Sequence, residues 1–204
     1  MPNIMNVDYE AIPAIARQVR IHAQDLNTQM LEIYSNISEM HNSWYGIRYN
    51  TLVKDFNNIM PEINNLLDLV VTEIPYTLET IANNYALVDR GSKVTSAEKT
   101  TSRKLSTLVM PNDIGMKFLT NEVTSTKTKV STNFKNAKEI MNSIENIYNR
   151  IQWQSEASEA FRSRFTKLKN NIVNAFDNLE VQFIKLMTQT VEDIQATENA
   201  NTVQ

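Results

Sequence analysis

The chain has 204 residues, 42% of them hydrophobic, and only 3 are glycine and 5 proline. So few turn-forming residues favour an all-α fold over all-β and α/β folds, which need many turns. The formal net charge of -3 gives no electrostatic reason to expect nucleic-acid binding, and the absence of cysteine excludes disulfides, thiolate catalysis and cysteine-bound metals.

The first predicted helix covers residues 12–40, where apolar side chains recur at steps of three and four. Asp8 is its expected N-cap. Pro13 suits the first turn, where a missing amide proton costs no helical hydrogen bond.

A second apolar run with helical spacing extends over residues 52–88. The helix is expected to end near Asp89, with Gly91 as the stop signal. Pro61 and Pro75 lie inside it, and each removes a backbone donor. We therefore predict one bent helix, with a break in this region as the alternative.

The following segment, from Arg90 to Gly115, is rich in serine, threonine and lysine and is predicted to be a polar linker. It is either a solvated connector or a contact site for an acidic partner. The second interpretation depends on its basic residues, which are Arg90, Lys93, Lys99, Arg103 and Lys104.

Two further helical runs follow, over residues 123–151 and 161–194, and the polar residues from Ala196 onward are expected to fray. Trp153 lies 109 residues after Trp44. With this shift, the apolar positions after the first tryptophan fall on apolar positions after the second. A shift of 111 aligns the two preceding helices in the same way.

The repeat predicts a duplicated helical hairpin. The first hairpin is expected over residues 1–91, the linker over 92–117, and a second, diverged hairpin over 118–204. A single long hairpin would leave one apolar flank exposed, whereas two can cover each other. The predicted fold class is therefore all-α: two long antiparallel helical hairpins packed as an elongated four-helix bundle.

The turn of the first hairpin contains Trp44 and Gly46, within the sequence HNSWYGIRYN. Gly46 is expected to relieve the backbone at the reversal and to serve as an N-cap. For Trp44 and Trp153 the simplest interpretation is structural, as large apolar side chains that close one end of the core.

Taken together, these features resemble the WXG superfamily of type VII secretion substrates. The Trp-x-Gly turn is Trp44 and Gly46. The sequence YALVD supplies Tyr85 and Asp89, which match the Tyr-x-x-x-Asp/Glu motif that this family carries near the end of its second helix. The i, i+4 spacing puts both residues on one helix face, where a recognition protein can read them together.

The second half resembles the family less closely. Trp153 is followed by Gln154 and Ser155 without the glycine, and Ile194 and Glu198 occupy the positions that match Tyr85 and Asp89. The second hairpin thus retains the acid and lacks the tyrosine. This difference favours a role as a built-in partner over a second export signal.

The resemblance implies a non-enzymatic protein that a membrane ATPase exports in a folded, paired state, with turn and tail read together as the signal. The implied partners are the type VII secretion ATPase and membrane machinery, and a second copy or a WXG or LXG protein. The N-terminus lacks a basic region followed by an apolar one, so no Sec-type signal peptide is expected. The resemblance therefore implies a secreted or surface protein that leaves the cell by a route without a cleaved signal peptide. Frequent Asn, Ile and Lys suggest a low-GC Gram-positive bacterium.

Catalytic and metal-binding patterns are not found in the sequence, and no cofactor, metal or nucleic acid is expected. His22 and His41 are 19 residues apart, too far for a metal site on one helix. Glu73 and Glu79 are six apart and need not face each other.

Two alternatives to a secretion substrate stay open. The first is a membrane-active, pore-forming helical protein, which the polar residues beside the apolar stripes disfavour. The second is a cytosolic chaperone or adaptor for a secreted LXG-type toxin. The sequence leaves the partner, the oligomeric state and any membrane contact open.

Overall fold

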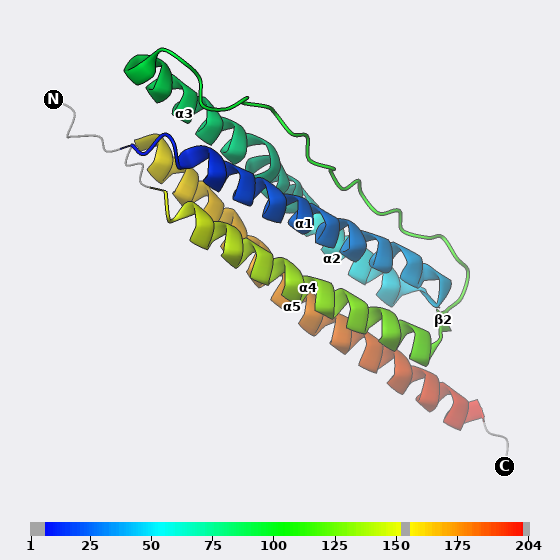
Figure 1. The fold of residues 1–204 in the computed structure, drawn as a ribbon. Coiled ribbons are helices and arrows are strands. Elements are labelled where there is room, and N and C mark those ends of the chain that lie inside the picture. Colours follow the sequence, from blue (N-terminus) through cyan, green and yellow to red (C-terminus); the bar gives the residue numbers. More distant parts are fainter. Residues whose placement is uncertain (1–6, 152–155, 202–204) are drawn as a thin grey trace.

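The computed structural model describes residues 7–151 and 156–201, and within these ranges it confirms the all-α fold (Figure 1). Long helices lie side by side in an elongated bundle, and the strands are two residues each. The elements are α1 (Ile12–Glu39), the 3-10 helix η1 (Met40–Asn42), β1 (Trp44–Tyr45), α2 (Ile47–Leu67), the π-helix η2 (Asp68–Glu73), α3 (Ile74–Arg90), β2 (Lys117–Phe118), α4 (Thr120–Tyr148) and α5 (Glu156–Asn201).

Helix α1 begins at Ile12, as the apolar pattern predicts, but its N-cap is Ala11, not Asp8. The chain makes a turn between these residues. The Asp8 carboxylate accepts a hydrogen bond from the amide of Ala11 at 3.0 Å, and its carbonyl accepts one from the amide of Ile12 at 3.3 Å. Asp8 thus caps the preceding turn, while Pro13 lies in the first turn of the helix as expected.

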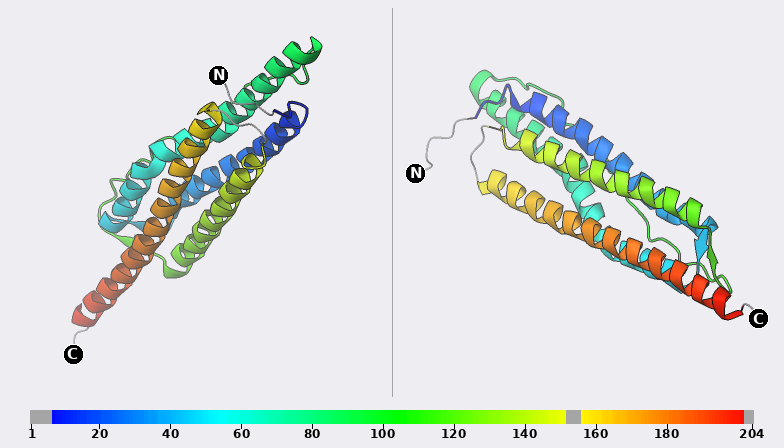
Figure 2. Two further views of the ribbon diagram at one scale, coloured as in Figure 1. Left: turned by 90° about the vertical axis from the view of Figure 1, so that its left-hand side faces the viewer. Right: turned by 90° about the horizontal axis from the view of Figure 1, so that it is seen from below.

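The segments α2, η2 and α3 form one uninterrupted helix that changes direction at the π-helix, so the bent-helix prediction is correct (Figure 2). Pro75 cannot donate to the carbonyl four residues before it. The wider π turn takes up this defect, and the amide of Ile74 donates to Leu69, five residues back. The helix ends at Gly91, which has a left-handed φ of 73° and donates to Leu87 at 3.1 Å.

Each helix of the first half packs against its counterpart in the second half. Helix α1 packs mainly on α4, and α2 packs mainly on α5, while α1 also contacts α3. The apolar stripes meet in one hydrophobic cluster, in which Phe134 of α4 stacks on Phe176 of α5 with ring centroids 4.4 Å apart. Burial of these faces is the main stabilising contribution to the bundle.

The segment between α3 and β2 is not the solvated connector that its composition predicts. It runs in an extended conformation along the bundle, where Leu105 and Leu108 are both buried. We call residues 94–111 the strap. Beyond it, Phe118 of β2 pairs antiparallel with Trp44 of β1. The predicted linker therefore contains a packed segment and ends in the first residue of β2.

Helix α5 continues to Asn201, so the polar tail is helical where fraying was expected. Figure 1 shows its last turns projecting beyond the start of α4. Within the described ranges, no helix is both long and apolar enough to cross a membrane.

Candidate functional site

The reversal between α1 and α2 is built around Trp44, whose exposed fraction is 1%. Phe183 of α5 stacks on its indole with centroids 6.0 Å apart, and Phe118 of β2 meets it edge-on at 5.5 Å. Tyr49 of α2 adds a third ring at 6.1 Å. Trp44 thus closes one end of the core, and it does so with partners from both halves of the chain.

Gly46 is the N-cap of α2, as the sequence predicts. Its φ of 121° and ψ of -175° lie in a region that residues with a Cβ rarely adopt. A Cβ added there would lie 3.5 Å from the carbonyl oxygen of Gly115, an ordinary van der Waals distance. The requirement for glycine at this turn is therefore conformational rather than steric.

Polar contacts fasten this turn to α1 and to the end of the linker. The Tyr49 hydroxyl donates to the carbonyl of Ile37 at 2.9 Å, and burial raises the pKa of Tyr49 to about 12. His41 pairs with Asp113 at 2.6 Å. This pair joins η1 to the linker.

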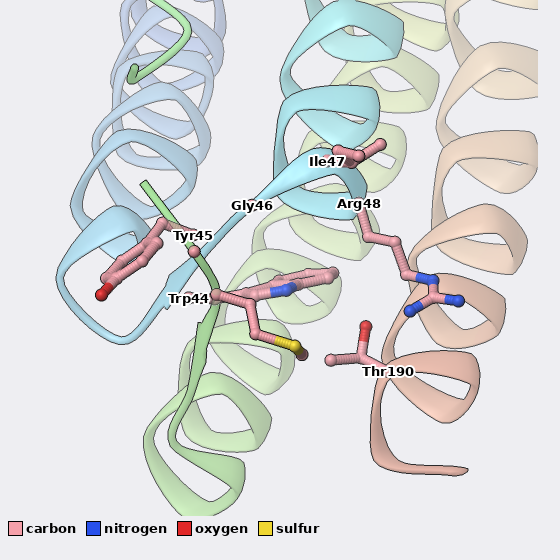
Figure 3. Close-up of a pocket in the computed structure, with 8 residues that line it drawn as sticks. Trp44, Tyr45, Gly46, Ile47, Arg48 and Thr190 are labelled. Carbon is pink, nitrogen blue, oxygen red and sulfur yellow. The ribbon is translucent and has the colours of Figure 1, made fainter. Parts of the chain in front are cut away.

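A cavity of about 340 Å³ opens beside the tryptophan (Figure 3). Trp44 and Met116 contribute to its apolar lining, and Arg48 and Thr190 add polar groups from α2 and α5. Ile47, at its edge, is 86% exposed. The cavity could accept an apolar side chain of a partner, because it combines an exposed apolar edge with few polar groups.

The residues predicted as the export signal lie at the opposite end of the α2–η2–α3 helix. Asp89 is exposed in the last turn of α3, and Tyr85 is half-buried one turn earlier. Measured along the bent helix, the pair lies about 60 Å from Trp44. The structure therefore does not bring the turn motif and the tail motif together within one chain.

Asp89 has a partner within the chain. The hydroxyl of Tyr9 donates a hydrogen bond to the Asp89 carboxylate, and this bond raises the pKa of Tyr9. Next to it, Arg90 pairs with Glu10 at 3.2 Å. These contacts tie the segment before α1 to the end of α3.

The two glutamates considered as a catalytic pair face different arginines. Glu79 is buried and forms a two-pronged pair with Arg20, at 2.8 and 3.0 Å. Glu73 is paired with Arg164 of α5 at 2.6 Å. Within the described ranges, no group of three or more histidine, cysteine or acidic side chains could hold a metal ion.

Sequence reasoning missed the polar residues that bind the strap. The asparagine side chains of α2 facing it recur every seven residues, at Asn50, Asn57 and Asn64, and each contacts the strap backbone. A heptad of asparagines beside an apolar stripe was the available signal, because such spacing aligns side chains along one helix face.

Comparison of the chain with protein-family models, with curated proteins and with solved structures gave no match. Trp153, Gln154 and Ser155, the predicted turn of the second hairpin, lie outside the described residues.

Proposed function

We propose that the chain is a non-enzymatic substrate or partner of a type VII secretion system, exported as a folded helical bundle. The observation that carries the proposal is the arrangement of the two motifs on one helix. Gly46 caps its start beside the buried Trp44, and Asp89 is exposed in its last turn. A surface carboxylate one helical turn after Tyr85 is accessible to a recognition protein without unfolding of the bundle.

The packing of the two halves supports export in the paired state. The apolar stripes of α1 and α2 are covered by α4 and α5, so the chain provides its own partner. The same packing disfavours a pore-forming role, because these stripes would have to leave the core before they could contact lipid.

Export is tested by the distribution of tagged protein between culture supernatant and cell lysate, with and without the secretion ATPase. We expect ATPase-dependent secretion of the unaltered chain. We expect at least tenfold less secretion of the Tyr85→Ala and Asp89→Asn variants, with unchanged helicity and thermal unfolding. Asn84→Ala, an exposed change in the same helix, is the matched control.

Secretion of both single variants and of the double variant at the level of the control would contradict the assigned signal. Retention of the unaltered chain in the cytosol would contradict export itself. The adaptor alternative would then be favoured, and its test is co-purification with an LXG-type toxin.

A further inference from the structure

The strap is bound by its backbone, through asparagine side chains that pair with both polar groups of single strap residues. Asn57 binds the amide and the carbonyl of Leu108, both at 2.9 Å. Asn64 binds the amide and the carbonyl of Leu105 at 2.8 and 2.9 Å. Such two-pronged pairing satisfies both backbone polar groups of the residue, whatever side chain it carries.

The opposite wall of the groove, on α1, also presents residues seven apart. Asn27 binds the amide and the carbonyl of Arg103, both at 2.8 Å. Arg20 and Tyr34, seven residues to either side, contact the carbonyl of Glu98 at 3.2 Å and the hydroxyl of Ser106 at 3.2 Å. The strap therefore lies between two rows of polar side chains, one on α1 and one on α2–η2–α3.

The spacing of these rows fits a polyproline II segment. Asn50 donates to the carbonyl of Pro111 and Asn83 to that of Thr95, at the two ends of the strap. The helix rises about 50 Å between the two asparagines. A polyproline II segment between the two strap residues also rises about 50 Å. That conformation repeats every three residues. Ser102, Leu105 and Leu108 are accordingly buried at this interval.

The π-helix keeps the second row aligned beyond the bend. After Asn57 and Asn64, the next residues that bind the strap backbone are Thr72 and Glu79, one position later than a strict heptad requires. A π turn adds one residue without ending the helix. The bend at Pro75 and the polar row are thereby compatible.

Other contacts depend on the strap sequence. Asp68 accepts hydrogen bonds from Ser102 at 2.5 Å and from Lys104 at 2.7 Å. Burial acts to raise the pKa of Asp68, but these two bonds outweigh it and leave the pKa below its ordinary value. The groove thus matches its occupant in charge as well as in spacing.

We propose that the groove between α1 and the α2–η2–α3 helix is a binding site for an extended polypeptide in the polyproline II conformation, and that the strap of a second copy can fill it in trans. An identical chain supplies the buried leucines, Ser102 and Lys104 at the correct spacing. The ends of the strap permit release, since Gly91 and residues 112–115 are exposed and the pair between His41 and Asp113 lies at the surface. The proposal is independent of export.

The strap bound in cis sets the conditions for exchange. A tethered segment competes at an effective concentration in the millimolar range. The groove is therefore expected to accept a strap in trans only when its own strap is weakened. Two complementary full-length variants meet this condition. The first carries Leu105→Asp and Leu108→Asp in the strap, and the second carries Asn57→Ala and Asn64→Ala in the groove.

The test is the molar mass of each variant alone and of their equimolar mixture, measured by size-exclusion chromatography with light scattering. We expect each variant alone to be monomeric and the mixture to form a one-to-one complex. The matched control replaces the second variant with one that carries all four changes, and no complex is expected. A mixture that stays monomeric, with both variants helical by circular dichroism, would overturn the proposal.

A second measurement uses a milder strap variant, so that its result does not depend on the folding of the chain with two aspartates in the strap. A fluorescent peptide of residues 94–111 is titrated into the full chain carrying only Leu108→Ala and into the unaltered chain. At least tenfold tighter binding to the variant is expected. Equal binding, or undetectable binding to both, would overturn the proposal. Tight binding that persists after Asn57→Ala and Asn64→Ala are added would also overturn it.

Discussion

The phenol of Tyr9 donates a hydrogen bond to the carboxylate of Asp89, which joins the segment before α1 to the last turn of α3. The pair lies at the end of the first hairpin that is distant from Trp44. One of the two residues assigned to the export signal is therefore bound within the chain before any partner arrives.

The contact gives a test of whether Asp89 itself is recognised. Tyr9→Phe removes the hydrogen bond and leaves the charge of Asp89 unchanged. Because a recognition protein would read the free carboxylate, we expect undiminished secretion of this variant and loss of secretion for Asp89→Asn. The measurement is the secreted fraction at equal expression. A similar loss in both variants would show that the intramolecular bond matters instead.

The ion pair between Arg20 and Glu79 is expected to be sensitive to removal of one partner. The Glu79 side chain is only 5% exposed, so Glu79→Leu leaves the Arg20 guanidinium without its charged partner. We expect a loss of about 3–5 kcal/mol in the free energy of unfolding, measured in urea. Addition of Arg20→Met should recover most of it. Glu98→Gln is the comparison: it keeps the backbone carbonyl that accepts from Arg20 and removes only a nearby charge, so it should cost much less.

Gly46→Ala tests the conformational requirement at the turn. The backbone there has a φ of 121°, and we expect a cost of about 3 kcal/mol in the free energy of unfolding. Gly91→Ala, at a left-handed position with open space around it, should cost about 1 kcal/mol. Urea unfolding of both variants measures the difference. Equal, small costs would contradict the assignment of strain to Gly46.

Asn64→Ala tests how strongly the strap is held. The change removes two hydrogen bonds to the backbone of Leu105, and we expect a loss of about 1–3 kcal/mol in the free energy of unfolding. Amide hydrogen exchange of the strap should also become faster. Asn58→Ala, an exposed change in the same helix, should leave both measurements unchanged.

Alkaline pH is expected to destabilise the chain partly through Tyr49. Its pKa is about 12 in the folded chain and near its ordinary value of 10 when unfolded. The stabilisation is thus complete below pH 10 and is lost as the pH rises towards 12, by about 1–2 kcal/mol after allowance for solvent screening. Urea unfolding at pH 8 and pH 11.5 should show a smaller pH dependence for Tyr49→Phe. An equal dependence would contradict this assignment.

The sequence predicted the helices and the turn because their signals are local. Apolar residues at steps of three and four define a helix face wherever it later packs. Gly46 and Gly91 marked the start and the end of one helix through a backbone requirement that acts within a few residues. The match between the two halves predicted that the hairpins would cover each other.

The strap and its groove were decided by tertiary structure. A polar segment with leucines three residues apart has too little apolar surface to fold alone, so its composition indicates only a linker. Its conformation depends on asparagine side chains of α1 and α2. Asn27 of α1, for example, lies 76 residues before the strap residue that it binds. The heptad spacing of asparagines in α2 can be read from the sequence, but the segment that they bind cannot, because these contacts exist only after α1 and α2 have packed.

The sequence by itself thus determined the all-α class, the helix start at Gly46 and stop at Gly91, and the duplicated pattern, since these depend on propensity and periodicity. Only the tertiary structure showed that Trp44 stacks on Phe183, that Asp89 is bonded to Tyr9, and that the strap fills a groove. Each of these relationships joins residues far apart in the chain, and burial and hydrogen-bond geometry select them after the helices have formed.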